Sequence, residues 1–391
     1  MNNKSKIITA IILIILSAIS TAIYFKYFHP QYNDWAVETS PDGERLALVR
    51  MVAPRGKREY KFQIWTFKTD GSSGRRLFRV PDEYTVDMET MNPIYWINDE
   101  LFLIVRDKRG FRAIYIINSQ TGKARLWSQG FKNDLILGLT SKGALTARYL
   151  HYNNFYLLFR PFGKKNFTKL QKVITNNPRA KSAISSDGNN IIIIESYHNS
   201  RTNPQINNLL TIDRSSDKTS ICGIDDMLIY YPRWIEAGKK LVFIAKEGLH
   251  TLNFSGKNIE SEDIKIPGNF RIYYSYDKNN NMVYIPTDSQ DELYVGKLKR
   301  AKFDRVKIGV PIMPPVKISP DGKHLFFISY DNDRNCNLYS FNLKERKLVE
   351  LTKNEFGKRH LTRRKMRILF DRRQYGIIIS KEERDKREEA K

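Results

Sequence analysis

The chain has 391 residues and carries 66 lysines and arginines against 42 acidic residues, a formal net charge of +24. This length allows one large or two ordinary domains, and a hydrophobic fraction of 41% excludes a disordered chain. Only two cysteines occur, Cys222 and Cys336, which excludes a disulfide framework. The charge indicates attraction to acidic proteins, acidic polymers or anionic lipids, or a solvated basic surface.

The N-terminal segment predicts a membrane anchor. After residues 1–6, a basic tail, an uncharged run reads IITAIILIILSAISTAIYF from Ile7 to Phe25. Its 19 residues, at about 1.5 Å each, nearly match the roughly 30 Å hydrocarbon core of a bilayer. We therefore expect a transmembrane signal-anchor helix over residues 7–28, with residues 1–6 in the cytoplasm. Ala18 and Ser20 resemble a signal-cleavage site, so secretion after cleavage is the alternative.

A phrase of turn and strand recurs along the chain. SPDGERLALVR begins at Ser40, and SPDGKHLFFIS begins at Ser319. Successive starts of this phrase and its degenerate copies are separated by 56, 44, 45, 49, 42 and 43 residues. The five copies between the first and the last are WINDELFLIV from Trp96, TSKGALTARYL from Thr140, SSDGNNIIIIES from Ser185, WIEAGKKLVFIA from Trp234 and YDKNNNMVYIP from Tyr276.

Repeats of this length, built of short strands, predict an all-β propeller of four-stranded blades over residues 34–352. In the last copy, an apolar strand HLFFIS follows the turn, and NLYSFNL and LVELT follow a polar hairpin. Pro320 presets the backbone for the first corner of the turn, Asp321 accepts hydrogen bonds from it, and Gly322 tolerates a positive φ. The count favours seven blades and leaves six or eight open.

The Ser-Pro-Asp-Gly turn, the apolar strand, the polar hairpin and the closing Leu351-Thr352 resemble the blade repeat of TolB-like propellers. Units one, four and seven match well, and the others are degenerate. The resemblance implies that the ring faces and the central channel bind protein partners in a bacterial envelope.

The chain changes character at its C-terminal end, and we expect residues 353–391 to form a basic extension. Thirteen basic and six acidic residues occur from Gly357 onward. The apolar islands MRILF and YGIIIS predict a packed hairpin, and KEERDKREEAK predicts a charged tail.

Catalytic motifs are missing from the sequence. Propellers similar to this one precede catalytic domains in the prolyl oligopeptidase and dipeptidyl peptidase families, but those domains need a Gly-x-Ser-x-Gly elbow, which does not occur here. The glycine motifs that bind phosphates, Gly-x-x-x-x-Gly-Lys-Ser/Thr and Gly-x-Gly-x-x-Gly, do not occur either. The six histidines are scattered, and DNDRNCN lacks the glycine and glutamate of a calcium loop. We therefore expect no catalytic residue, no cofactor and no metal.

The remaining candidate site is a basic surface. The loops between the second and third strands of a blade emerge on one face of the ring. In units one and two these loops are APRGKREYK and RDKRGFR, each with a net charge of +3, and we expect KLKRAKFDRVK from Lys297 to lie toward the opposite face. The candidate partner-binding residues are Arg55, Lys57, Arg58, Tyr60, Lys61, Arg106, Lys108, Arg109, Phe111 and Arg112.

From these features we predict a membrane-anchored, non-enzymatic propeller in the periplasm or outside the cell, which binds an envelope protein and steers an acidic partner with its basic loops. Direct binding of an acidic polysaccharide or an anionic lipid is the first alternative. An enzyme with a site at the channel mouth is the second. The expected orientation disfavours nucleic acid as a partner.

Overall fold

The computed structural model describes residues 14, 15, 17, 31–53, 61–87, 92–127, 134–151, 154–162, 167–174, 182–197, 206–214, 218–224, 230–235, 239–245, 248–255, 258–264, 270–276, 281–286, 291–297, 302–330 and 335–354. Outside these ranges lie most of the predicted anchor and of the extension over residues 353–391. Residues 14, 15 and 17 have helical backbone. None of the helical structure in the described residues is long and apolar enough to span a bilayer.

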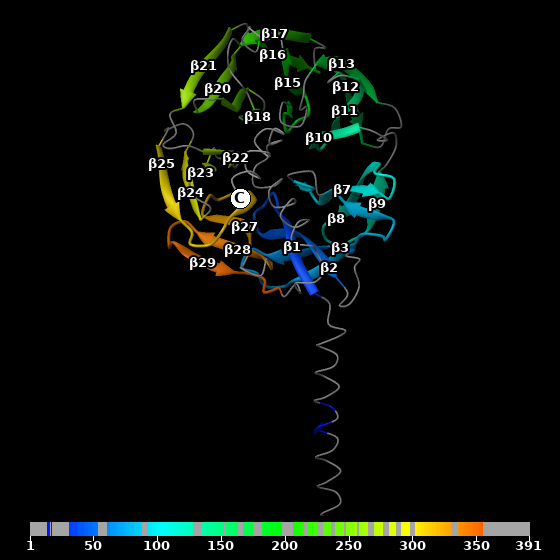
Figure 1. The fold of residues 1–391 in the computed structure, drawn as a ribbon, viewed down its shortest axis with the longest axis vertical. Coiled ribbons are helices and arrows are strands. Elements are labelled where there is room, and N and C mark those ends of the chain that lie inside the picture. Colours follow the sequence, from blue (N-terminus) through cyan, green and yellow to red (C-terminus); the bar gives the residue numbers. More distant parts are fainter. Residues whose placement is uncertain are drawn as a thin grey trace, which may run out of the picture.

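The described strands form seven antiparallel sheets that follow one another around a ring (Figure 1). Blade 1 contains β1 (Gln31–Thr39), β2 (Arg45–Ala53), β3 (Lys61–Lys68) and β4 (Arg75–Arg79). Blade 2 contains β5 (Tyr84–Val86), β6 (Ile94–Ile97), β7 (Glu100–Asp107), β8 (Arg112–Asn118) and β9 (Ala124–Trp127). Its inner strand is divided, because β5 and β6 both pair with β7.

The next blades each have four strands. Blade 3 contains β10 (Asp134–Thr140), β11 (Gly143–His151), β12 (Asn154–Pro161) and β13 (Thr168–Ile174). Blade 4 contains β14 (Ser182–Ile184), β15 (Asn190–Tyr197), β16 (Ile206–Asp213) and β17 (Lys218–Ile224). Blade 5 contains β18 (Tyr230–Ile235), β19 (Lys240–Ala245), β20 (Gly248–Ser255) and β21 (Asn258–Ile264).

Blade 6 contains β22 (Phe270–Tyr276), β23 (Asn281–Pro286), β24 (Glu292–Lys297) and β25 (Lys302–Lys307). Blade 7 contains β26 (Met313–Ile318), β27 (His324–Tyr330), β28 (Cys336–Asn342) and β29 (Lys347–Glu350). In six blades the strands pair in chain order, and blade 2 differs only in that β5 and β6 both pair with β7. The last strands that Figure 1 labels, β9, β13, β17, β21, β25 and β29, lie at the rim of the ring. The predicted all-β fold is confirmed, and six of the seven described sheets have the predicted four strands, whereas blade 2 has five because its inner strand is divided.

The recurring turn has the same geometry wherever the serine and aspartate are kept. In blade 1 the Ser40 hydroxyl donates to Asp42 Oδ1 at 2.5 Å, and Gly43 has a φ of +84°. In blade 7 Ser319 donates to Asp321 at 2.5 Å, and Gly322 has a φ of +72°. Glycine adopts this left-handed backbone without steric cost. The turn therefore sets the start of the second strand, as predicted.

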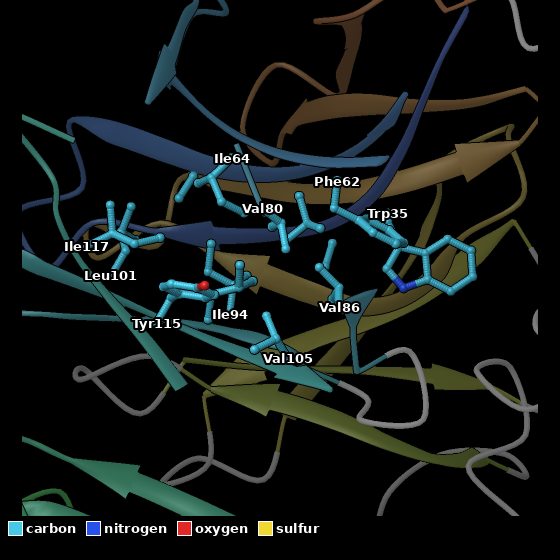
Figure 2. Packing of buried hydrophobic residues seen from close by; sticks show 14 of the residues in the cluster. Trp35, Phe62, Ile64, Val80, Val86, Ile94, Leu101, Val105, Tyr115 and Ile117 are labelled. Carbon is cyan, nitrogen blue, oxygen red and sulfur yellow. The ribbon is translucent and has the colours of Figure 1, made fainter. Parts of the chain in front are cut away.

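The hydrophobic core lies between neighbouring blades. The second strand of blade 1 is buried along almost its whole length, because it is covered on both sides. One cluster joins blades 1 and 2 through Trp35, Phe62, Leu101 and Tyr115 (Figure 2). Similar clusters join blades 2 and 3, blades 3 and 4, blades 4 and 5, and blades 6 and 7. Each blade is thus stable only with its neighbours, as expected of a ring of repeated units.

Blade 1 closes the ring against blade 7 without exchanging a strand. Strands β1–β4 form one sheet and β26–β29 form another. Strand β1 lies against β26, β27 and β28, and an apolar cluster that includes Leu46 and Phe326 spans the junction. The first turn also packs on the last one, since a Cβ added to Gly43 would lie 2.8 Å from Pro320 Cδ.

Polar side chains complete this junction. The backbone N–H of Cys336 donates to Asn33 Oδ1, and the Thr352 hydroxyl donates to Asp34 Oδ2. Thr352 Oγ1 in turn accepts from the N–H of Leu338 at 2.8 Å. Because Asn33, Asp34 and Thr352 are buried, these contacts are well protected from water. We call this network, Asn33, Asp34, Cys336, Leu338 and Thr352, the seam.

Candidate binding surface

The first predicted basic loop connects β2 to β3, and most of it lies outside the described residues. The candidates in the range 54–60 are outside the described residues; they are Arg55, Lys57, Arg58 and Tyr60. Lys61 is the first residue of β3, and its Nζ lies 2.6 Å from Asp82 Oδ2. The Lys61 contact, followed by that of Arg79, outweighs desolvation and lowers the pKa of Asp82. Lys61 is therefore paired with a residue of the segment that connects blade 1 to blade 2.

The second predicted loop is a tight hairpin rather than an extended basic segment. Asp107 Oδ1 accepts from the N–H of Arg109 at 2.9 Å and from the N–H of Phe111 at 2.8 Å. Desolvation raises the pKa of Asp107, but these hydrogen bonds and Arg109 lower it overall. The Arg109 side chain is 77% exposed and stacks over Phe111. Lys108 and Arg109 form the accessible basic tip of this hairpin.

Arg106 and Arg112 are buried deeper than the loop pattern predicts. Both lie on strands, at opposite positions of the β7–β8 pair. Arg106 Nε lies 2.9 Å from Asp87 Oδ1, and Arg112 Nε lies 2.8 Å from Asp87 Oδ2. The Asp87 side chain is buried. These two arginines thus hold one carboxylate at the inner edge of blade 2, and only the hairpin tip projects beyond them.

The same Asp–Arg pairing occurs in blades 1 and 3. Asp34 and Arg50 are opposite each other in the β1–β2 pair, with Oδ1 and Nε 2.8 Å apart. Asp134 and Arg148 are opposite each other in the β10–β11 pair, also at 2.8 Å. Sequence reasoning missed these residues. Their signal was an aspartate six residues before the turn, at Asp34 before Ser40 and Asp134 before Thr140.

Inner strands of three blades also meet in a polar contact. Glu38 Oε2 accepts from Lys317 Nζ at 2.7 Å and from Asn92 Nδ2 at 2.9 Å. Glu38 lies on β1, Lys317 on β26, and Asn92 just before β6. Across the described part of the chain, no group of three or more His, Cys, Asp or Glu side chains is placed to hold a metal ion.

Comparison with known proteins rests on structure alone. No family model matches the sequence, and no curated protein matches it. The propeller domain of the Trilobed protease from Pyrococcus furiosus, described as having an open velcro topology, aligns with a TM-score of 0.59 and 10% identity. The match covers 84% of this chain and all of that one. The fold is a β-propeller.

Other structural matches include larger peptidases. A prolyl endopeptidase aligns with a TM-score of 0.60 and 10% identity, over 87% of this chain and 52% of its own. Prolyl oligopeptidase B from Galerina marginata aligns with a TM-score of 0.55 and 12% identity, over 85% and 52% of the two chains. This propeller therefore spans about half the length of these peptidases. TolB from Acinetobacter baumannii also aligns, but its TM-score of 0.45 is too low to support an assignment of the fold.

These neighbours correct the functional prediction. The sequence led us to expect a non-enzymatic scaffold, whereas the structural matches are prolyl endopeptidases and a puromycin hydrolase. The expectation was wrong because it rested on motifs within this chain, and the motifs of a catalytic domain do not belong to a propeller.

Proposed function

We propose that this chain takes part in peptide hydrolysis, as a propeller that admits and selects peptides for a peptidase catalytic unit. The observation that carries the proposal is the extent of the structural match. The chain aligns over 87% of its length with about half of a prolyl endopeptidase, and over 84% with the whole propeller of the Trilobed protease. Since 10% identity shows the fold alone, the activity is our proposal.

Two features of this chain support that assignment. The ring is closed at the seam by side chains rather than by a shared strand, and the propeller of the Trilobed protease is also described as an open velcro. The Glu38–Lys317–Asn92 contact places a charged pair on the inner strands. Such polar groups give the inner surface partners for peptide termini and backbone.

The catalytic nucleophile comes, in this proposal, from a unit that supplies the Gly-x-Ser-x-Gly elbow missing from this sequence. The apolar run from Ile7 to Phe25 supports the further proposal that the propeller is anchored to a membrane and works on its outer side. An envelope protein partner of the kind first predicted would then be that catalytic unit.

The proposal is tested with the tagged full chain, isolated from its source cells in mild detergent. This preparation is assayed with a mixture of internally quenched peptides, beside the chain produced alone. We expect the isolated assembly to cleave peptides, with inhibition by a fluorophosphonate, and the chain alone to bind peptides. A tagged unrelated membrane protein from the same cells is the control. Absence of peptide cleavage by the isolated assembly would refute the proposal.

A further inference from the structure

Blade 3 carries a row of charged and aromatic side chains on one side of its sheet. Asp134 is opposite Arg148, Arg148 is opposite Tyr156, and Tyr156 is opposite Lys172 in the pairing of β10–β13. Directly opposed residues of an antiparallel sheet project to the same side. The row therefore runs from the buried inner strand to the exposed rim.

Two aromatic rings are packed between the cations of this side. The guanidinium carbon of Arg148 lies 5.3 Å from the Phe167 ring centre, and that of Arg160 lies 4.8 Å from it. Lys169 Nζ lies 3.5 Å from the centre of the Tyr156 ring. These separations are within the range of cation–π attraction, so the rings and cations hold one another in position.

Buried charge fixes the inner end of the row and leaves its outer end accessible. Asp134 is fully buried and lies 2.8 Å from Arg148 Nε and 2.5 Å from Arg160 Nη2. The Arg148 side chain remains 37% exposed, and Phe167 is 42% exposed. Lys169 and Lys172 are exposed on β13. Accessible arginine and aromatic side chains of this kind are typical of the energetic centres of interfaces.

We infer that this surface, formed by Arg148, Tyr156, Phe167, Lys169 and Lys172, binds an extended acidic peptide segment. The inference rests on the proposed role in peptide hydrolysis and names the class of peptide. The accessible charges are positive, so the ligand supplies carboxylates. Strand β13 is the outermost strand of blade 3 and pairs with β12 alone among the described strands. An extended chain can therefore hydrogen-bond along its edge.

The test is fluorescence anisotropy with the full chain in mild detergent and a labelled peptide of alternating glutamate and serine. The double variant Lys169→Gln/Lys172→Gln should bind this peptide about five- to tenfold more weakly, since two exposed charge pairs are lost. Phe167→Ala should weaken binding about fivefold or more by loosening the cation stack. A counterpart peptide with glutamine in place of glutamate should bind the unaltered chain at least tenfold more weakly.

Two matched controls lie away from this surface. Tyr149→Ala removes an exposed aromatic side chain of β11. Because Tyr149 directly follows Arg148 in the strand, it projects to the other side of the sheet. Arg125→Gln removes an exposed arginine that pairs with Glu100 in blade 2. Both should bind the acidic peptide within about twofold of the unaltered chain. Circular dichroism checks that each variant is folded.

Unchanged affinity in both the lysine variant and Phe167→Ala would overturn the inference, and so would equal binding of the glutamine peptide. Vesicles of phosphatidylglycerol form a separate arm. If the variants lose vesicle binding and keep peptide binding, the surface is a lipid site and the inference fails. Peptide cleavage by the isolated assembly is scored independently. If the isolated assembly cleaves peptides and the variants keep their peptide affinity, only this inference is refuted. If the variants lose peptide binding and the isolated assembly cleaves no peptide, only the proposed function is refuted.

Discussion

The serine hydroxyls of the recurring turns make hydrogen bonds whose contribution to stability can be measured with a single substitution. Ser319 is buried, donates to Asp321 and accepts from the N–H of His324 at 2.9 Å. We expect Ser319→Ala to lower the free energy of unfolding by about 1 kcal/mol, because the turn loses these hydrogen bonds. Urea unfolding followed by circular dichroism measures the change. Thr85→Ala, at an exposed position, should change it by less than about 0.5 kcal/mol.

The aspartates of the same turns predict a loss of stability in acid. The hydrogen bond from Ser40 lowers the pKa of Asp42 from the ordinary value of 3.8. Burial raises the pKa of Asp187 and of Asp321, but serine and backbone hydrogen bonds lower both overall. A depressed folded-state pKa contributes stability above the unfolded-state value and loses it as pH falls through the folded-state value.

We therefore expect the urea midpoint to be nearly constant above about pH 5 and to fall as pH is lowered below the unfolded-state value of 3.8. The triple variant Asp42→Asn/Asp187→Asn/Asp321→Asn keeps one acceptor oxygen at each position and removes the titrating groups. Its midpoint should fall less steeply between pH 5 and pH 3 than that of the unaltered chain. Equal slopes would show that other carboxylates govern the acid transition.

Single residues also show where sequence reasoning stopped. The turn at Ser319 was predictable because serine, proline, aspartate and glycine each meet a local backbone requirement. Arg106 and Arg112 were predicted as loop residues, but both bind Asp87, which reaches them only through the pairing of β5 with β7. A contact made across strands leaves no local pattern, so the charge of these arginines was predictable and their partner was not.

At the scale of elements, the seam joins β1 to β28 and to the segment after β29. Asp34 is fully buried between Arg50 and Thr352. We expect Asp34→Ala to lower the free energy of unfolding by about 3–5 kcal/mol, because the variant lacks the carboxylate that neutralises the buried Arg50 guanidinium. Thermal or urea unfolding measures this loss.

The control for this prediction is Asp82→Ala. Asp82 also pairs with basic side chains, Lys61 and Arg79, but its side chain is 60% exposed. Its removal should lower the free energy of unfolding far less than the removal of Asp34, since solvent screens exposed pairs. Similar losses in both variants would mean that Asp34 contributes no more than a surface charge.

Some strands could be predicted from the sequence, and others could not. The strands after the turns were predictable because apolar runs follow a turn of known geometry, as in β27. The divided inner strand of blade 2 was not predictable, because β5 and β6 are short and become one row only through their common partner β7. The blade 3 surface was missed for the same reason: Arg148, Tyr156 and Lys172 are adjacent only in the folded sheet.

At the scale of the whole molecule, a covalent link across the junction of blades 1 and 7 should stabilise the ring. A Cβ added to Gly43 would lie 3.6 Å from Pro320 Cβ, within the range found in disulfides. We expect the oxidised variant Gly43→Cys/Pro320→Cys to unfold at higher urea than its own reduced form, by about 2–4 kcal/mol. Comparing the two redox forms cancels the strain of a non-glycine residue at a φ of +84°.

Mass spectrometry under non-reducing conditions verifies the bond in this variant. The single variant Gly43→Cys, treated with the same oxidant, should show no such gain. If the oxidised and reduced double variants unfold together, the two end blades are already held as firmly by the seam as by a covalent bond. The closed ring would then behave as a single cooperative unit regardless of the added link.

Because each sheet is made from one uninterrupted stretch of chain, gene duplication can add or remove a complete unit without breaking any backbone pairing in the units that remain. An added blade has to pack only against the apolar faces of its two neighbours. An added or lost blade would change the circumference of the ring, and with it the width of the central channel.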